Sequence, residues 1–597
     1  MPSTPRPAPD PTTLTGLFAR SVSRFPHLTA VTDDHASFTY AELDARSDDV
    51  ASALRARGVR PEDRVGLHLD RGVEVFAAIL GILKAGAAYV AVDTRYPDAR
   101  RDLMLTHSGV RIVLTRPGPG AALGGLPLDT LELPVPPADG SGPGPGDLAR
   151  PDGAASVLFT SGSSGTPKAV VLEHRNIVSF AVNPALPPLR SEDRTGQISS
   201  LSFDAFHFEM WATLARGGQV VVLPPVPDLL AAGFRAALER RGITAMLVPT
   251  MVVNQVVRED RDAFAPLRLL HVGGDVLQPA ACARLLSGAF RGELLNLYGP
   301  AETTTACTAH RVTLDDTRAD SIPIGRPLDG VTVHLLGPDR RPVPPGVAGE
   351  IHIGGPSVGR GYLSVPGRPD RTERAFVPSP LPDGPRRLYR TGDLARRRAD
   401  GVLEFLGRAD DQVKIRGYRV EPAEVARSLR HHPLVHDAVV LASGEGEDRH
   451  LVAFAVLDEP VPVSALLDFA RERLPHYLVP SRIVVLPEIP ATHHGKRDTA
   501  ALRALLTREA GQEDAVPATD TERYLVGLWR SLLGVEEVGV RDDFFALGGH
   551  SLLAFRMQRR IERERGVALE YPSLVRTSVL ADLAALVDAT ATEGAAR

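Results

Sequence analysis

Strand-like apolar runs alternate with amphipathic helical segments along most of the first 500 residues, and this alternation limits the possible folds more than any other feature. Helical periodicity over residues 14–22 and 40–57 precedes a strand-like run at 64–69. Further along, a strand-like run at 219–223 precedes a helical pattern over 229–241. Because helices that follow strands one by one pack on the faces of a mainly parallel sheet, the sequence predicts an α/β fold.

The chain changes character twice, which predicts several domains in its 597 residues. A large α/β subdomain is expected over 12–409 and a small α/β lid over 410–510. Residues 511–520 form a polar linker, and 521–590 contain only amphipathic helical patterns. The Pro- and Gly-rich stretch 117–153 is expected to be an exposed connection within the large subdomain.

Charge and cysteine content exclude several classes of protein. The formal net charge of −5 argues against a protein that coats nucleic acid or an anionic membrane. Cys282 and Cys307 are the two cysteines, too few for a disulfide framework, and they fit a reducing compartment. The longest apolar stretch, 75–92, contains Lys84 and is a poor membrane span, and the N-terminus has no secretory pattern. We therefore expect a cytoplasmic protein.

Lysine is scarce, since only four of the 68 basic residues are lysine: Lys84, Lys168, Lys414 and Lys496. A compact ammonium and a planar guanidinium do not replace each other freely at a tight site. The alternative is that these lysines have no function and persist by chance. For Lys84, chance and function explain the lysine equally well. For the other three lysines, the surrounding motif decides between function and chance.

A loop of glycines and hydroxyl residues follows the apolar run 155–159. Backbone N–H groups and hydroxyls in such a loop can hold phosphate oxygens. The lysine at its end adds a charge, although this is no Walker A loop because Pro167 precedes that lysine. The alternative is a flexible surface turn. The loop consists of Thr160, Ser161, Gly162, Ser163, Ser164, Gly165, Thr166, Pro167 and Lys168.

Four further motifs carry candidate nucleotide ligands. In 296–304, Tyr298 could stack on a base and Glu302 could hold Mg²⁺, although aromatic-Gly-Pro is also a common turn. Asp393 could accept two hydrogen bonds from ribose hydroxyls or form an Asx turn. The runs 407–417 and 494–498 alone could be solvated charge runs.

These five motifs, in this order, resemble the adenylate-forming superfamily, and specifically the amino-acid adenylation domains of nonribosomal peptide synthetases. Supporting matches lie at 83–90, 203–204, 349–363 and 474–477, and the resemblance covers about residues 12–510. It implies a large subdomain with mainly parallel sheets and a small C-terminal lid.

The helical module resembles a peptidyl carrier domain, which implies an all-α, four-helix fold. The match is 543–552, in which Ser551 opens a helix after two glycines. A phosphodiester there would be favoured by the helix N-terminus, and an N-cap serine is the compatible alternative. Leu553 stands where a hydrolase elbow needs glycine, so the motif is not such an elbow. The resemblance implies 4′-phosphopantetheine attachment at Ser551.

By resemblance, each motif has a role in binding ATP with Mg²⁺. The 160–168 loop holds the phosphates, Lys496 is the catalytic residue that bridges the substrate carboxylate and the nucleotide, and Asp410 is the hinge of the lid. Ala301 replaces the family's usual threonine, so one phosphate hydrogen bond is missing. The remaining nucleotide and metal ligands are Asn296 for the adenine amino edge, Tyr298 for the adenine face, Asp393 and Arg408 for the ribose, and Glu302 for Mg²⁺.

The amino-acid pocket is inferred in the same way. Asp204 matches the aspartate that pairs with the substrate ammonium. The other wall positions contain no carboxylate or lysine, so a charged side chain would lack a partner. We expect a bulky neutral amino acid, branched aliphatic or aromatic, whose hydroxyl could meet His271 or Thr305. The wall consists of Ala205, Phe208, Leu247, His271, Gly273, Leu297, Thr305 and Ala306.

The resemblance implies a stand-alone didomain of antibiotic or other secondary metabolism. It would form aminoacyl-AMP and load the amino acid as a thioester on its own carrier domain. Its partners would be a phosphopantetheinyl transferase and a downstream tailoring or condensation enzyme, with an MbtH-like activator left open. One alternative is an acyl or aryl acid ligase, which Asp204 disfavours. The other is a catalytically weak carrier platform, for which Ala301 is the only hint.

Overall fold

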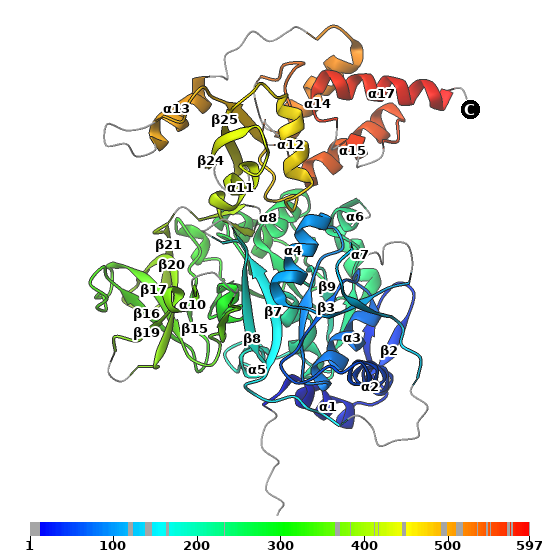
Figure 1. The fold of residues 1–597 in the computed structure, drawn as a ribbon, viewed down its shortest axis with the longest axis vertical. Helices are drawn as coiled ribbons and strands as arrows, with labels where there is room; N and C mark the ends of the chain where they lie inside the picture. The colour runs from blue at the N-terminus through cyan, green and yellow to red at the C-terminus, as the bar shows by residue number, and fades with distance from the viewer. Residues whose placement is uncertain are drawn as a thin grey trace, which may run out of the picture. The chain divides into compact units, whose positions relative to one another are not determined.

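The predicted alternation of strands and helices forms several separate sheets (Figure 1). The computed structural model divides into two units, residues 1–161 with 167–412, and residues 162–166 with 413–597. It describes residues 12–595 except 118–122, 124, 138–145, 163–165, 232, 365–369, 382–383, 411, 416, 445–448, 491–497, 509–516, 534, 536, 545–546, 548, 550, 570–572 and 575–576.

The first unit contains a nine-stranded sheet in the order β15-β14-β13-β12-β11-β9-β10-β1-β2. The pairs from β13 through β1 are parallel, and antiparallel pairs occur only at its two edges. Its strands are β1 (Thr29–Thr32), β2 (Ser37–Thr39), β9 (Arg194–Gln197), β10 (Gln219–Val222), β11 (Ala245–Pro249), β12 (Leu269–Gly273), β13 (Glu293–Tyr298), β14 (Thr308–Arg311) and β15 (Arg326–Pro327).

A seven-stranded sheet in the order β18-β8-β7-β4-β3-β5-β6 lies in the same unit. It is parallel from β7 through β6, whereas β7, β8 and β18 pair antiparallel. Both large sheets therefore confirm the α/β prediction. The strands are β3 (Arg64–Leu67), β4 (Ala88–Ala91), β5 (Ile112–Thr115), β6 (Asp129–Glu132), β7 (Ala154–Thr160), β8 (Lys168–Glu173) and β18 (Gly361–Tyr362).

A smaller, wholly antiparallel sheet completes the first unit. The order is β16-β17-β20-β19, and β21 also pairs with β20. Its strands are β16 (Thr332–Leu336), β17 (Ala348–Gly354), β19 (Phe376–Pro378), β20 (Arg387–Arg397) and β21 (Leu403–Arg408).

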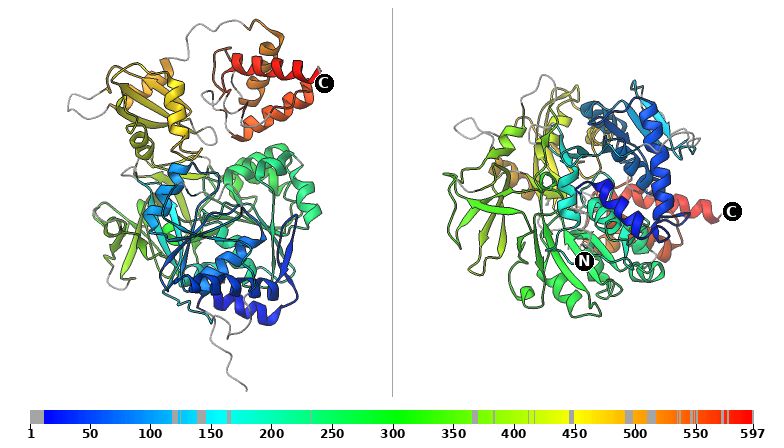
Figure 2. Two further views of the ribbon diagram at one scale, coloured as in Figure 1. Left: turned by 45° about the vertical axis from the view of Figure 1, so that its right-hand side comes forward. Right: turned by 90° about the horizontal axis from the view of Figure 1, so that it is seen from below.

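Helices cover the large sheets, and the apolar stretch 75–92 forms a buried helix and strand (Figure 2). A Cβ at Gly81 would lie 2.5 Å from the Cβ of Val50, so glycine allows α2 and α3 to pack closely. Lys84 ends α3 and pairs with Asp44 and Asp48 at 2.6 and 2.7 Å, which supports a structural role.

Within the described part of the chain, no helix is long and apolar enough to span a membrane. The helices are α1 (Leu14–Arg24), α2 (Tyr40–Ala56), α3 (Val73–Lys84), α4 (Asp98–Ser108), α5 (His174–Ala181), α6 (Val226–Ala231), α7 (Phe234–Arg241), α8 (Thr250–Glu259), α9 (Pro279–Leu286) and α10 (Thr372–Ala375), with short helices η2 (Phe208–Ala212), η3 (Ala301–Thr303) and η4 (Asp316–Arg318).

The single helix predicted over 229–241 is wrong. Two helices, α6 and α7, replace it, and the second begins after Gly233. Gly233 has φ +82°, a left-handed conformation that interrupts a right-handed helix and that glycine adopts readily.

The second unit contains two small sheets and a group of helices. β24 and β25 pair antiparallel and β25 and β26 pair parallel, while β22 and β23 form a separate hairpin. The helical patterns predicted over 521–533, 551–565 and 579–587 correspond to α14, α15 and α17, which share a core around Trp529 and Phe544. The elements are β22 (Val413–Ile415), β23 (Tyr418–Val420), α11 (Pro422–Leu429), β24 (Val435–Ser443), β25 (His450–Leu457), α12 (Val463–Arg471), β26 (Arg482–Val485), α13 (Thr499–Arg508), α14 (Asp520–Leu533), α15 (Ser551–Arg565) and α17 (Leu580–Ala595).

Candidate functional site

Three of the four residues predicted to hold the nucleoside form one hydrogen-bonded group. Asp393 on β20 is in register with Arg408 on β21, and their side chains form an ion pair. The hydroxyl of Tyr298, at the end of β13, donates to Asp393 Oδ2 at 2.6 Å. Burial and the Asp393 carboxylate raise the pKa of Tyr298 well above its usual value, so the phenol stays a neutral donor. The carboxylate is thus held firmly beside an aromatic ring.

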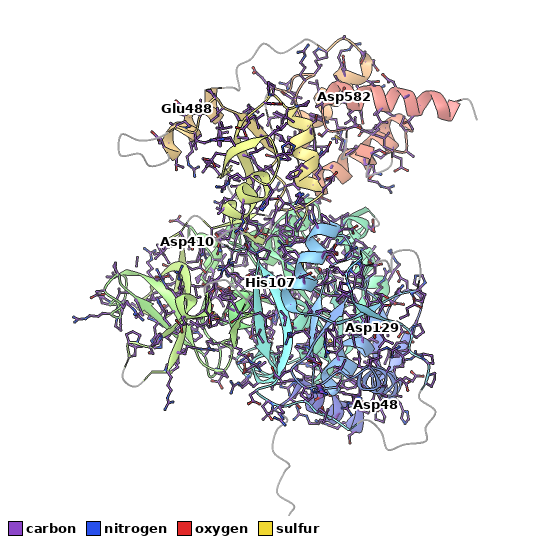
Figure 3. All side chains as sticks on the ribbon, in the orientation of Figure 1. Asp48, His107, Asp129, Asp410, Glu488 and Asp582 are labelled. Carbon is purple, nitrogen blue, oxygen red and sulfur yellow. The ribbon has the colours of Figure 1, made fainter. Side chains whose placement is uncertain are left out.

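Arg408 also holds the predicted hinge residue. Its Nε and Nη2 donate to the two carboxylate oxygens of Asp410 at 2.7 and 2.8 Å. Asp410, labelled in Figure 3, follows the end of β21 and is exposed. A Cβ at Gly392 would lie 2.7 Å from Arg408 Nη2, so the glycine leaves room for this guanidinium between two aspartates.

Asn296 lies on the same strand as Tyr298 and is buried. Its amide nitrogen donates to the carbonyl of Pro323 at 2.8 Å, which fixes the orientation of the side chain. The carboxamide oxygen is then the group suited to accept a hydrogen bond from an adenine amino group.

The predicted phosphate loop connects two antiparallel strands. Thr160 at the end of β7 pairs with Lys168 at the start of β8, so no helix N-terminus follows the loop and only N–H groups, hydroxyls and the lysine could bind phosphate. Ser163, Ser164 and Gly165 lie outside the described residues. Within the second unit, the Gly162 N–H donates to Glu424 at 3.2 Å and Arg427 donates to the Thr166 hydroxyl at 3.3 Å.

Glu302 is a fully buried carboxylate on η3, directly after Ala301. The hydroxyl of Tyr362 donates to its Oε1 at 2.7 Å. The described residues contain no group of three or more His, Cys, Asp or Glu that could hold a metal. A single carboxylate oxygen therefore fits Mg²⁺ that takes its other ligands from phosphates and water.

Four of the predicted substrate-wall residues lie on three neighbouring parallel strands. Leu247 on β11 is in register with His271 on β12, and Gly273 is in register with Leu297 on β13. A Cβ at Gly273 would lie 3.0 Å from the carbonyl oxygen of Leu297, so this position favours glycine. The ring of Phe208, on η2, lies 4.6 Å from the His271 ring between centroids. Ala205 and Ala306 pack in the same apolar cluster, so the structure brings the predicted wall together.

His271 is the polar exception in this wall. It is fully buried, and neither ring nitrogen has a hydrogen-bond partner among the described residues. Burial lowers its pKa to about 3, so the ring is neutral and offers one donor and one acceptor. A buried, unsatisfied imidazole is costly unless a ligand or water completes its hydrogen bonds.

The carboxyl group of Asp204 is strongly desolvated, although the residue as a whole is only half-buried. Burial first, and then the negative charge of Glu302, raise its pKa from 3.8 to about 7. The hydroxyl of Thr305 donates to the backbone carbonyl of Asp204 at 2.8 Å. Thr304 and Thr305 have φ of +60° and +66°, which is strained for β-branched residues and commonly marks a functional site.

Two further residues, Tyr362 and the buried Glu209, have no sequence signal that assigns them a role. Tyr362 stands in a motif used only as a supporting match, and its contact with Glu302 depends on the pairing of β18. Glu209, on the π-helix η2, is fully buried and accepts backbone hydrogen bonds from Ile198 and Ser199 at 3.0 Å each. Its signal in the sequence is a single carboxylate within the apolar run 206–212.

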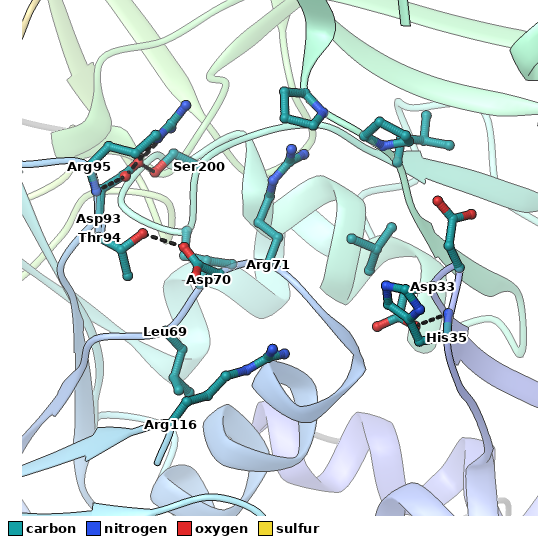
Figure 4. Close-up of a pocket in the computed structure, with 16 residues that line it drawn as sticks. Asp33, His35, Leu69, Asp70, Arg71, Asp93, Thr94, Arg95, Arg116 and Ser200 are labelled. Carbon is teal, nitrogen blue, oxygen red and sulfur yellow. Dashed lines mark hydrogen bonds and ion pairs between the residues drawn. The ribbon is translucent and has the colours of Figure 1, made fainter. Parts of the chain in front are cut away.

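A separate cavity of about 400 Å³ lies at the carboxyl ends of strands from both large sheets (Figure 4). Arg71 reaches into it, and Arg95 forms a two-point ion pair with Asp93 at 2.9 and 2.7 Å. Asp33 accepts three backbone N–H groups, from residues 35, 36 and 73. None of the predicted site residues lines this cavity.

The last two predicted residues are Lys496 for adenylation and Ser551 for attachment of the pantetheine arm. Lys496 lies outside the described residues. Ser551 is the first residue of α15, a 15-residue helix.

The fold is that of an AMP-binding enzyme joined to a phosphopantetheine carrier domain. A family model for AMP-binding enzymes matches residues 18–363, more than half of the chain, and one for the AMP-binding enzyme C-terminal domain matches 424–496. A model for the phosphopantetheine attachment site matches 523–587. The chain belongs to the AMP-binding enzyme family, whose nucleotide is ATP with Mg²⁺, and its carrier domain carries 4′-phosphopantetheine.

Curated relatives are much longer proteins, and the chain spans only a small part of each. Gramicidin S synthase 2 of Brevibacillus brevis is 36% identical over 96% of this chain, which spans 13% of that protein. Malpibaldin synthetase of Mortierella alpina is 37% identical over 98% of this chain, which spans 11% of that protein.

Solved structures include proteins with the same domain organisation. A holo nonribosomal peptide synthetase protein with adenylation and peptidyl carrier domains, bound to a vinylsulfonamide inhibitor, is 31% identical with a TM-score of 0.82. The match covers 97% of this chain and 98% of that one. A four-domain nonribosomal peptide synthetase bound to AMP and glycine is also 31% identical, with a TM-score of 0.59 over 96% of this chain and 42% of that one.

Proposed function

We propose that this protein activates a bulky neutral amino acid as aminoacyl-AMP and transfers it to the pantetheine thiol on Ser551. The observation that carries the proposal is the apolar packing of the predicted wall residues, whose only charged member is Asp204. Asp204 supplies the only charge at the predicted wall positions, which suits the ammonium group common to amino acids. The remaining wall is apolar apart from His271 and Thr305.

The nucleotide would lie along the residues already described. Asp393, Arg408 and Tyr298 would hold the adenosine, Asn296 would accept from the adenine amino group, and Lys168 would face the phosphates. When bound, Mg²⁺ supplies positive charge to the phosphates. The substrate carboxylate would then attack the α-phosphate in line, and Lys496 would stabilise the negative charge that develops.

We propose that Asp410 is the hinge between the two half-reactions. The chain passes from the first unit to the second after Gln412, two residues beyond Asp410. A hinge needs only a few residues that absorb a backbone rotation. The proposed domain limits are 12–409, 410–510, 511–520 and 521–590, supported by family matches that begin at 424 and 523.

The wall residues also indicate which substrate side chains would bind. Phe208, Leu247 and Leu297 offer apolar surface, and each buried methylene contributes about 0.8 kcal/mol. The unpaired ring nitrogens of His271 favour a substrate with a hydroxyl group at that depth, because such a group would satisfy a buried donor or acceptor.

A screen of ATP–pyrophosphate exchange against single amino acids tests this proposal. Exchange should be strongest with branched aliphatic or aromatic amino acids and negligible with aspartate, glutamate, lysine or arginine. Exchange driven by aryl or fatty acids instead would identify an acid ligase, and no exchange with any acid would identify a carrier platform. A tailoring or condensation enzyme, a phosphopantetheinyl transferase and an MbtH-like protein are the partners to be tested by reconstitution.

A further inference from the structure

Tyr362 is held against two parts of the proposed nucleotide site by the short strand β18. Its backbone pairs with Val170 of β8, and the N–H of Leu363 donates to the carbonyl of Ala169 at 2.8 Å. Lys168 lies two residues before Val170 on the same strand, so its side chain shares a face with that of Val170. Tyr362 is therefore a diagonal cross-strand neighbour of the phosphate lysine.

Two glycines that precede Tyr362 make this position possible. A Cβ at Gly359 would lie 2.9 Å from the Leu172 side chain and 3.3 Å from the backbone oxygen of Glu302. A Cβ at Gly361, which has φ +138°, would lie 2.5 Å from the Thr372 side chain. The Gly359 N–H also donates to the Glu302 carbonyl at 2.9 Å. Residues 359–363 therefore pack against both β8 and η3.

The side chain of Tyr362 contacts each neighbour through a different part. Its hydroxyl donates to Glu302 Oε1 at 2.7 Å. Its ring lies 5.8 Å, measured at the centroid, from the ammonium of Lys168, within the range of a cation–π contact. The ring also packs edge-on against Phe376 at 5.5 Å, which fixes its plane.

We propose that Tyr362 is a positioning residue that orients the Mg²⁺ ligand Glu302 through its hydroxyl and the phosphate ligand Lys168 through its ring. This inference rests on the proposed function, in which these two residues bind metal and phosphate. The two contacts are chemically separate, since phenylalanine would keep the ring and lose only the hydroxyl. Substitution should therefore separate a metal effect from a phosphate effect.

The test measures binding to the full chain, with α,β-methylene-ATP as the nucleotide and Mn²⁺ as the metal probe. Electron paramagnetic resonance gives the Kd of Mn²⁺ at saturating nucleotide, and calorimetry in EDTA gives the Kd of metal-free nucleotide. Tyr362→Phe should raise the Mn²⁺ Kd by about 10–100-fold, as is typical when the partner of a metal ligand is lost. The metal-free Kd should stay within about twofold because the ring contact remains. Tyr362→Leu should raise both.

Two further variants make the outcome decisive. Tyr40→Phe removes another buried hydroxyl, which donates to the Gly218 carbonyl at 2.7 Å, and it should change neither constant. Glu302→Gln should weaken Mn²⁺ binding at least as much as Tyr362→Phe. If Glu302→Gln weakens it and Tyr362→Phe does not, the inference about Tyr362 is wrong. If Glu302→Gln has no effect, the proposed metal site itself is wrong. Thermal denaturation of each variant confirms that it is folded.

Discussion

Lowering the pH from 8 to 6 should weaken amino-acid binding, because the carboxyl of Asp204 must be ionised to pair with the substrate ammonium. The pKa of this carboxyl is raised from 3.8 to about 7 in the free protein. A raised acid pKa means that ionisation destabilises the folded protein above pH 4, and a shift of this size corresponds to about 4 kcal/mol. An ammonium partner removes much of that penalty.

The expected magnitude follows from the ionised fraction. With a pKa near 7, Asp204 is about nine-tenths ionised at pH 8 and about one-tenth ionised at pH 6. The Kd of the preferred amino acid should therefore rise about tenfold over this range. Binding at pH 6 should release close to one proton per site, since the carboxyl ionises when the ammonium arrives.

Isothermal titration calorimetry at pH 6, 7 and 8, without nucleotide, measures this effect. Titrations in two buffers of different ionisation enthalpy count the released protons. Asp204→Asn should bind weakly at every pH and release no proton. Glu209→Gln is the matched control, because burial also raises the pKa of Glu209 to about 7, yet its carboxylate faces backbone N–H groups. A Kd that is constant from pH 6 to 8, without proton release, would refute the reasoning.

Four other outcomes are expected. Lys496→Ala should slow adenylation at least about a hundredfold, the loss typical of a positioned charge, but thioester formation from pre-made aminoacyl-AMP should change far less; equal losses would contradict its role. Ser551→Ala should keep pyrophosphate exchange and lose the pantetheine arm in intact-mass spectra; an arm on this variant would place the site elsewhere. Tyr298→Phe should raise KM for ATP by about tenfold through loss of the hydrogen bond to Asp393. His271→Leu should change the ranking of amino acids in the exchange screen, and an unchanged ranking would remove His271 from the pocket.

The fold class and the grouping of site residues could be predicted because both depend on local patterns. Alternation of apolar runs predicts parallel sheets, and the resemblance of the short motifs to a known family predicts which residues share a site. Asp393 and Arg408 are 15 positions apart in sequence but directly opposite in adjacent strands.

Long-range contacts could not be predicted in this way. Tyr362 is 60 residues from Glu302, and nothing in its local sequence specifies that β18 pairs with β8. The break at Gly233 was missed because periodicity alone does not reveal a left-handed residue. The raised pKa of Asp204 depends on burial, which sequence spacing does not give.

The position of the proposed substrate wall, partly on β11, β12 and β13, has a consequence for how such enzymes could diversify. Every proposed wall residue lies between Asp204 and Ala306, in one continuous piece of the chain. The ribose ligands Asp393 and Arg408 lie beyond it, on the antiparallel sheet. Recombination within this gene could therefore import a complete new pocket in a single event while the ribose ligands remain in place. Gradual change would instead require coordinated substitutions on three packed strands, because each new side chain must fit those on the neighbouring strands.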